Sequence, residues 1–174
     1  MDAQLGLDLV ESYGTPLYVY EGAVIKSQLD KLTSAFDVPE LRINYACKAL
    51  NNQTILKFMK HLGTGLDTVS IQEVRLGLKA GFNPDDILYT PNCVGFDEIE
   101  AATQLGVGIN IDNIEMLETF GHDFPGHPVC IRFNPHIMAG GNDKISVGHI
   151  DSKFGISIYQ LPLVKRLVET LKIN

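Results

Sequence analysis

The chain has 174 residues, of which 45% are hydrophobic and 20% charged, values ordinary for a soluble globular domain. Its net charge of −7 offers no attractive surface to nucleic acid or anionic lipid, so we expect a small-molecule ligand and no nucleic-acid or membrane partner. No signal peptide, no apolar run of roughly 18 residues and no paired cysteine spacing is found, which predicts a cytoplasmic protein.

The first part of the chain is predicted to hold one helix. We expect residues 1–22 to form a separate N-terminal segment with a strand at a domain junction. In residues 23–36, apolar side chains recur at spacings of three, four and seven, as on one face of an amphipathic helix. This helix should pack against a sheet.

From residue 42 onward, short apolar runs alternate with segments of helical periodicity, and turn residues separate them. Strands are expected at 42–49, 64–70, 87–90, 106–112 and 128–135. Helices are expected at 52–62, 71–80, 98–105, 114–120 and 161–171. The alternation predicts an α/β fold of parallel βα units, with no linker between them.

Such a run of units suits an open doubly wound sheet or part of a (β/α)8 barrel. A complete barrel takes about 250 residues, so with five strands visible a barrel would be incomplete. The loop His136–Ser152 is unusually long and rich in Gly, Asn, Asp and His. Long loops after strand ends are where α/β proteins keep lids and binding groups.

Lys48 lies at the carboxyl end of the first apolar strand, which in a parallel sheet is the functional end. It has two interpretations: a cation that reaches the rim, or an amine held in a pocket where partial desolvation favours the neutral form. An unprotonated amine is what attack on an aldehyde requires. Position alone leaves both interpretations open.

Several blocks of the sequence resemble the fold-type III pyridoxal-phosphate (PLP) decarboxylases, in particular the diaminopimelate decarboxylase family. YACKAL is similar to the motif in which that family holds its cofactor lysine, although Leu50 stands where asparagine is more frequent. YGTPLYVYE, GTGLDTVSIQEVRLGLKAGF, ILYTPNCVGFDEIEAA, IRFNP and GHIDSKFGI follow in the same order and spacing. The resemblance covers nearly the whole chain and implies the front part of a PLP-binding barrel of the alanine racemase kind.

The resemblance implies roles for particular residues. Lys48 matches the lysine that binds PLP covalently, Asp67 an acidic residue near the cofactor, and Arg132 an arginine on the pocket wall. Asp67 could instead cap the following helix, and Arg132 could form a salt bridge with a neighbouring strand. His149 lies on the long loop and could move protons near neutral pH, although a solvated loop histidine is the simpler interpretation.

The implied function is decarboxylation of meso-diaminopimelate to L-lysine and CO2 in lysine biosynthesis, by an enzyme that is a homodimer. The family's glycine-rich phosphate cradle and C-terminal β domain are absent from this sequence, so we expect the isolated chain to be inactive. The alternatives are decarboxylation of another substrate (ornithine, arginine or carboxynorspermidine) and a non-catalytic PLP-binding barrel. His61, His122, His127 and His136 share no metal-ligand spacing, so we assign them no chemistry and predict no metal.

Overall fold

The structure is a computed structural model that describes residues 2–137, 148 and 152–174. The chain divides into two compact units, Met1–Ile43 and Asn44–Asn174. The first unit contains helices α1 (Ala3–Tyr13) and α2 (Gly22–Ser34), and neither helix buries a side chain. None of the helices in the described parts of the chain is long and apolar enough to span a membrane.

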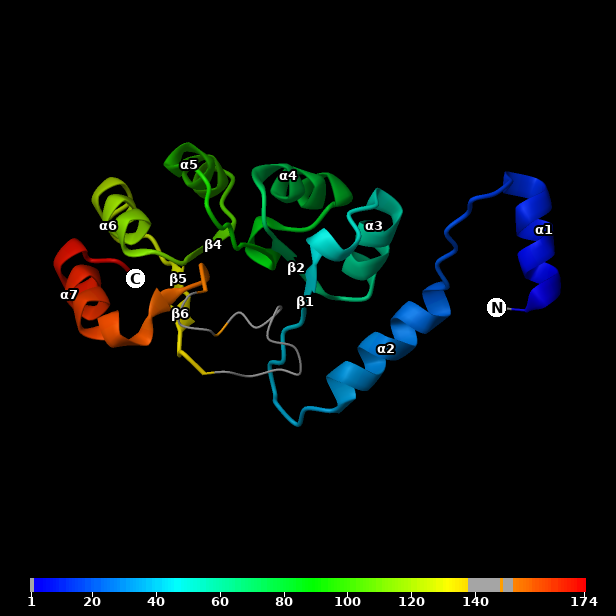
Figure 1. Cartoon of the computed structure of the whole chain (residues 1–174), viewed down its shortest axis with the longest axis horizontal. Coiled ribbons are helices and arrows are strands. Elements are labelled where there is room, and N and C mark those ends of the chain that lie inside the picture. Colours follow the sequence, from blue (N-terminus) through cyan, green and yellow to red (C-terminus); the bar gives the residue numbers. More distant parts are fainter. Residues whose placement is uncertain (1, 138–147, 149–151) are drawn as a thin grey trace. The chain divides into compact units, whose positions relative to one another are not determined.

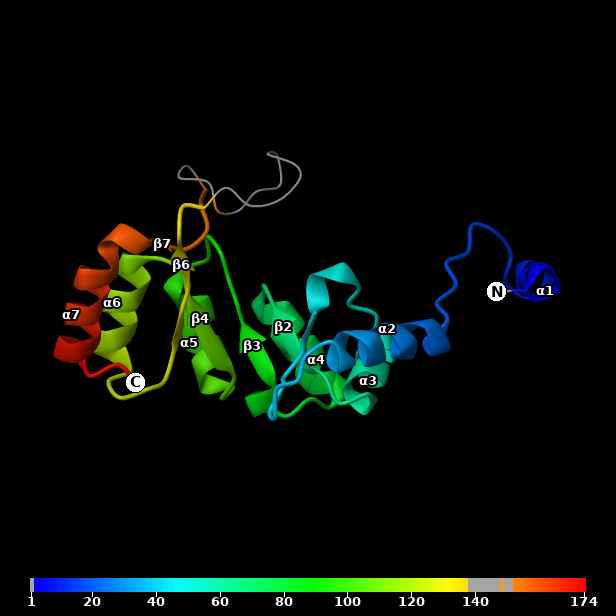
Figure 2. The same ribbon diagram turned by 90° about the horizontal axis from the view of Figure 1, so that it is seen from below.

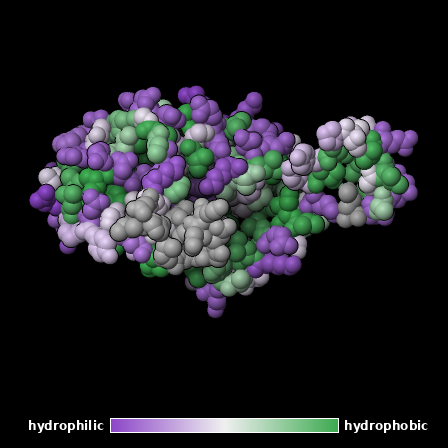
Figure 3. Space-filling model, viewed as in Figure 1, coloured by the Kyte–Doolittle hydropathy of each residue, from purple (hydrophilic) through white to green (hydrophobic). Residues whose placement is uncertain are grey.

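The first unit differs from the sequence prediction in two ways. Helix α1 forms where a strand is expected, because Asp2 caps its amino end and the following residues include good helix formers. Helix α2 has nearly its predicted bounds, but Val24 and Leu32 on its apolar face are about half exposed. Hydrophobic side chains also lie at the surface of α1, seen at the right of Figure 3.

The second unit is built from βα repeats, which confirms the predicted α/β fold. Its main strands are β1 (Asn44–Ala46), β2 (Gly65–Thr68), β3 (Ile87–Tyr89), β4 (Gly108–Ile111) and β5 (Cys130–Ile131). They form one parallel sheet in the order β1-β2-β3-β4-β5. Strands β6 (Phe133–Asn134) and β7 (Ile156–Ser157) form a second parallel pair.

Helices cover one side of this sheet. They are α3 (Gln53–His61), α4 (Ile71–Ala80), α5 (Phe96–Gln104), α6 (Ile114–Asp123) and α7 (Leu161–Leu171). Figure 1 shows them as an arc outside the strands, and α6 and α7 lie side by side there and in Figure 2. The bounds of α4 and α7 are the predicted ones.

Alternation along the strands separates a core face from a polar face. The core between sheet and helices includes strand residues that are at most 2% exposed, namely Leu66, Thr68, Ile87, Tyr89, Ile109 and Ile111. The residues between them in the sequence therefore point to the opposite face, because successive strand side chains alternate. That face carries the polar residues of the site described below.

The chain crosses from the large sheet to the small one at Arg132. Its backbone N–H donates to the carbonyl of Ile111 on β4 (2.8 Å), and its carbonyl accepts from Ile156 on β7 (2.8 Å). The strand predicted at 128–135 is therefore two short strands with different partners. Strand β7, which the sequence analysis does not predict, is too short to give a periodic signal of its own.

Candidate active site

One cavity of about 610 Å³ lies at the carboxyl ends of the parallel strands. Its wall combines one amine, one carboxylate, one guanidinium, two amides and a hydroxyl with apolar side chains. The lining residues are Lys48, Asp67, Val69, Leu88, Thr90, Asn92, Asn110, Arg132 and Phe154. Three of the four predicted site residues are thus brought together from segments 19 or more residues apart in the sequence.

Lys48 lies in the 3₁₀ turn η1 (Cys47–Ala49), which follows β1 directly. The strand ends at Ala46, two residues earlier than Lys48, so the lysine is on the turn and not on the strand as predicted. Its side chain borders the cavity but is exposed. The desolvation expected for a cofactor amine is therefore not supplied by the described residues.

Asp67 lies on β2, opposite Ala46 on one side and Leu88 on the other. Its Oδ1 accepts a hydrogen bond from the hydroxyl of Thr90 (2.8 Å). The alternative that Asp67 caps the next helix is wrong, because Ser70 caps α4 by accepting from the N–H of Glu73 (3.2 Å), and the Glu73 carboxylate accepts from the N–H of Val69 (2.9 Å). The Asp67 carboxylate therefore belongs to the cavity wall.

Arg132 is half-buried, and its guanidinium lies over the ring of Phe154, with Cζ 4.7 Å from the ring centroid. This is a cation–π contact, which leaves the edges of the planar guanidinium available as hydrogen-bond donors. The alternative of a salt bridge to a neighbouring strand is not found in the part of the chain that the structure describes. Arg132, which lies between β5 and β6, thus presents a cation to the cavity.

His149, predicted as a proton carrier, lies outside the described residues. His136, to which the sequence analysis assigns no chemistry, follows β6 and has well-defined contacts. Its Nε2 lies 2.7 Å from Oγ of Ser157, and its ring stacks on Tyr159 with centroids 5.3 Å apart. These contacts join β6 to the segment before α7 and place the histidine at the active-site end of the small sheet.

Six cavity residues were missed by sequence reasoning: the aliphatic Val69 and Leu88, and the polar or aromatic Thr90, Asn92, Asn110 and Phe154. Asn110 interrupts the apolar strand GINI at a position that alternates with Ile109 and Ile111, and this polar interruption is a signal that could have found it. Its Oδ1 is buried without a hydrogen-bond partner in the structure. A buried oxygen of this kind needs a donor, which a bound polar molecule can supply.

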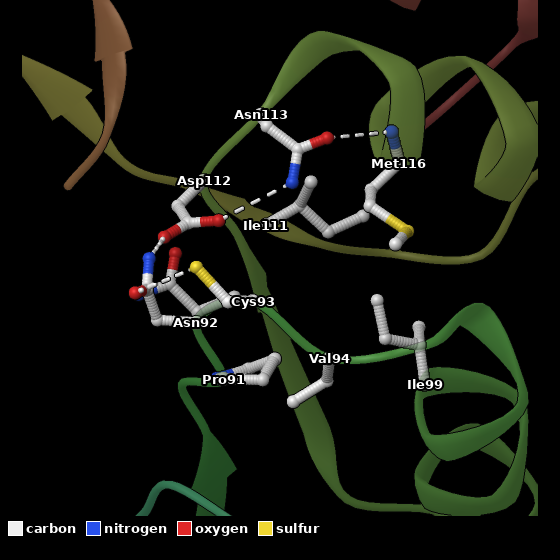
Figure 4. A pocket seen from close by; sticks show the side chains of 10 residues that line it. Pro91, Asn92, Cys93, Val94, Ile99, Ile111, Asp112, Asn113 and Met116 are labelled. Atoms are coloured by element: carbon white, nitrogen blue, oxygen red, sulfur yellow. Dashed lines mark hydrogen bonds between the residues drawn. The ribbon is translucent and has the colours of Figure 1, made fainter. Parts of the chain in front are cut away.

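Asn92 and Asn110 also border a second, much smaller hollow of about 10 Å³. Figure 4 shows Asn92 facing Asp112 and, through it, Asn113, whose Oδ1 caps α6 by accepting from the N–H of Met116 (2.9 Å). A line of hydrogen bonds thus runs from the amino end of α6 to the wall of the large cavity.

The residues present fit the cofactor that the resemblance implies. PLP needs an amine for its aldehyde and polar partners for its ring substituents, and the cavity offers Lys48 together with Asp67, Arg132 and the unpartnered oxygen of Asn110. All of these lie on or directly after strands β1, β2, β4 and β5 of one parallel sheet, near the carboxyl ends where ligands bind in α/β proteins.

Comparison with known proteins agrees with this geometry. Residues 23–174 match the family described as pyridoxal-dependent decarboxylase, pyridoxal binding domain. The chain is 36% identical over 168 residues to the diaminopimelate decarboxylase of Methanothermobacter thermautotrophicus, covering 95% of this chain and 39% of that protein. It is 33% identical to the Escherichia coli protein of the same name, covering 94% and 39% respectively.

Solved structures give the same result. A diaminopimelate decarboxylase from Helicobacter pylori, complexed with L-lysine, superposes with a TM-score of 0.88 at 30% identity, covering 97% of this chain and 44% of that one. The predicted barrel fold is therefore confirmed. The chain spans about two fifths of the length of these relatives.

Proposed function

This chain belongs to the pyridoxal-dependent decarboxylase family, and on that premise we propose that it supplies the cofactor lysine of an enzyme that converts meso-diaminopimelate to L-lysine and CO2. The observation that carries the proposal is the convergence of Lys48, Asp67 and Arg132 on one cavity at the carboxyl end of the sheet. The proposal concerns a protein in which this chain is part of the whole barrel.

When bound, PLP supplies an electron sink for the electron pair left on carbon after CO2 departs. Lys48 would hold it through a covalent bond from Nζ to the aldehyde carbon. The hydroxyl of Thr90 fixes the Asp67 carboxylate through Oδ1, and that carboxylate would orient the ring by accepting a hydrogen bond. Arg132, stacked on Phe154, would direct its N–H donors toward acidic oxygens in the same cavity.

We propose diaminopimelate as the substrate because the relatives above carry that name, and one of the similar structures is a complex with L-lysine. Another basic amino-acid substrate and a non-catalytic PLP-binding role are the alternatives. His149 stays a predicted proton carrier. Turnover of diaminopimelate, ornithine and arginine by the whole enzyme would rank the substrates.

We also propose that the isolated chain is inactive. The carbanion must be kept from water until it is protonated, which requires a closed site. The described residues leave Lys48 exposed at the cavity. A fragment of this kind should bind PLP without releasing CO2.

The whole protein is proposed to be a cytoplasmic homodimer. The location is supported by the three cysteines, which form no disulfide in the described residues. Two of them, Cys93 and Cys130, are exposed, and exposed thiols stay reduced in the cytoplasm. The homodimer is what the family resemblance implies. Light scattering of the whole enzyme would measure the oligomeric state.

The site is tested by adding PLP to the chain, reducing with borohydride and mapping the labelled peptide. We expect a new visible absorbance band and a label on Lys48 that is absent in Lys48→Ala. Lys57→Ala, which removes an exposed lysine from α3, is the matched control and should keep both signals. Labelling that persists in Lys48→Ala would contradict the assignment.

A further inference from the structure

Phe154 is held between two backbone attachments. On its carboxyl side, the N–H of Ile156 donates to the carbonyl of Arg132 (2.8 Å). On its amino side, Nδ2 of Asn92 donates to the carbonyl of Lys153 (3.3 Å). The ring that lies against the Arg132 guanidinium is therefore positioned from both ends.

Gly155 shows how closely this segment approaches the strand. A Cβ at this position would lie 2.8 Å from the backbone nitrogen of Asn134 and 2.9 Å from the carbonyl carbon of Phe133. The segment on the Ile156 side is thus in close backbone contact with β6. On the amino side, the N–H of Phe154 donates to Oγ of Ser152 nearby (3.2 Å), and the bond to a distant segment is the one from Asn92, which comes from the loop after β3, 61 residues earlier in the sequence.

Asn92 is itself fixed in place. The same Nδ2 donates to Oδ2 of Asp112 (2.7 Å), and Oδ1 accepts from the thiol of Cys93 (3.3 Å). The two N–H groups of one amide therefore serve two acceptors, a carboxylate at the end of β4 and a backbone carbonyl beside Phe154. No other standard side chain of this size offers two donors and an acceptor in that arrangement.

We propose that Asn92 is a positioning residue for the PLP site: by binding the Lys153 carbonyl it keeps Phe154 under Arg132 and so sets the direction of the guanidinium. The identity of the ligand, PLP, rests on the proposed function, whereas the contacts of Asn92 and Phe154 do not depend on it. Asn92 acts on the ligand through Arg132 and not directly.

The test uses an exchange of the two side chains. Asn92→Asp removes both N–H donors of the amide and places a second carboxylate next to that of Asp112, so that the two carboxylates repel each other. The double variant Asn92→Asp with Asp112→Asn restores an amide–carboxylate pair, but leaves no donor at position 92 for the Lys153 carbonyl. Asp112→Asn alone keeps that donor. Asn83→Asp alters a comparable but exposed Asn–Asp pair, Asn83 with Asp86, and is the control.

We expect the double variant to recover most of the thermal stability that Asn92→Asp loses, while its PLP affinity stays about 10-fold below that of the unaltered chain. Asp112→Asn and Asn83→Asp should change the affinity by less than about 3-fold. Affinity that recovers together with stability in the double variant would overturn the proposal, because Asn92 would then act on folding alone.

A second measurement does not depend on PLP. Hydrogen exchange of the peptide that contains residues 152–157 should accelerate in Asn92→Asp and in the double variant, and should be unchanged in Asn83→Asp. An exchange rate of this peptide that is unchanged in the double variant would show that Asn92 does not hold the Lys153 carbonyl in place, and it would overturn the proposal. Failure of the unaltered chain to bind PLP, with exchange behaving as expected, would count against the proposed function and leave the positioning role of Asn92 supported.

Discussion

Cys47 and Lys48 are neighbours in the sequence but have opposite surroundings. The turn η1 places Cys47 in the core, where it is completely buried, and leaves Lys48 exposed at the cavity. Burial raises the pKa of the Cys47 thiol from 9.0 to about 11, and the carboxylates of Glu73 and Asp67 add to the shift. The thiol is thus a core residue, and the amine beside it is the only one of the two available for chemistry.

The thiol can be tested by alkylation of the native chain near pH 8. Cys93 and Cys130 should react because they are exposed, and Cys47 should react only after unfolding. Peptide mapping after iodoacetamide treatment measures this. Rapid native labelling of Cys47 would contradict the buried position.

The raised pKa also predicts a pH dependence of stability. Between about pH 9 and 11 the unfolded thiol loses its proton while the folded one keeps it, so the free energy of unfolding falls as the pH rises. The loss is up to roughly 3 kcal/mol and is complete above the folded pKa. Urea unfolding should show this loss in the unaltered chain and in Cys93→Ala, and a smaller one in Cys47→Ala.

At the scale of elements, the site depends on short strands that exchange partners. Arg132 stands between β5 and β6, where the hydrogen-bond partner of the chain changes from β4 to β7, and its side chain lines the cavity. Gly155 permits the close approach of the segment before β7, at a φ of +83°. The βα periodicity does not reveal either feature.

Gly155→Ala should therefore be strongly destabilising. The added Cβ meets backbone atoms that cannot rotate away, and the positive φ adds strain, for a combined loss of about 2 to 4 kcal/mol. Gly126 has nearly the same φ, +82°, with nothing within 4 Å of the added Cβ, so Gly126→Ala should cost only about 1 kcal/mol. Equal losses in thermal or urea unfolding would contradict the close approach.

At the scale of the whole molecule, the two units differ in how much they bury. Helix α2 buries no side chain, whereas α3 buries Leu56 and Met59. Local unfolding of a helix is easier when few apolar contacts oppose it. The unit Met1–Ile43 should therefore open more readily than the unit Asn44–Asn174.

Limited trypsin digestion compares two matched pairs of exposed lysines. Lys26 and Lys31 lie on α2, and Lys57 and Lys60 lie on α3. We expect trypsin to cleave after the two α2 lysines well before it cleaves after the two α3 lysines. Mass spectrometry of samples taken during the digestion measures the order of cleavage. Cleavage of α3 at the same rate would mean that burial does not control the stability of these helices.

The sequence by itself determined the repeating βα architecture and the family, and it assigned Lys48, Asp67 and Arg132 to the first, second and fifth expected strand segments. These follow from local periodicity and from motifs, which can be recognised in the sequence because each βα unit is one continuous stretch of residues. Helix bounds were accurate at α4, where Ser70 and Gly81 cap the two ends, and at α7, where Pro162 stands in the first turn.

Only the tertiary structure decided which polar residues share the cavity and what each of them contacts. Thr90 with Asp67, Asn92 with Lys153, and Arg132 with Phe154 are pairs that are 22 to 61 residues apart. Strand register and the partner exchange at Arg132 set these contacts, and both depend on packing between distant segments. The exposure of Lys48 is likewise a property of the assembled fold, because burial depends on neighbours from other parts of the chain.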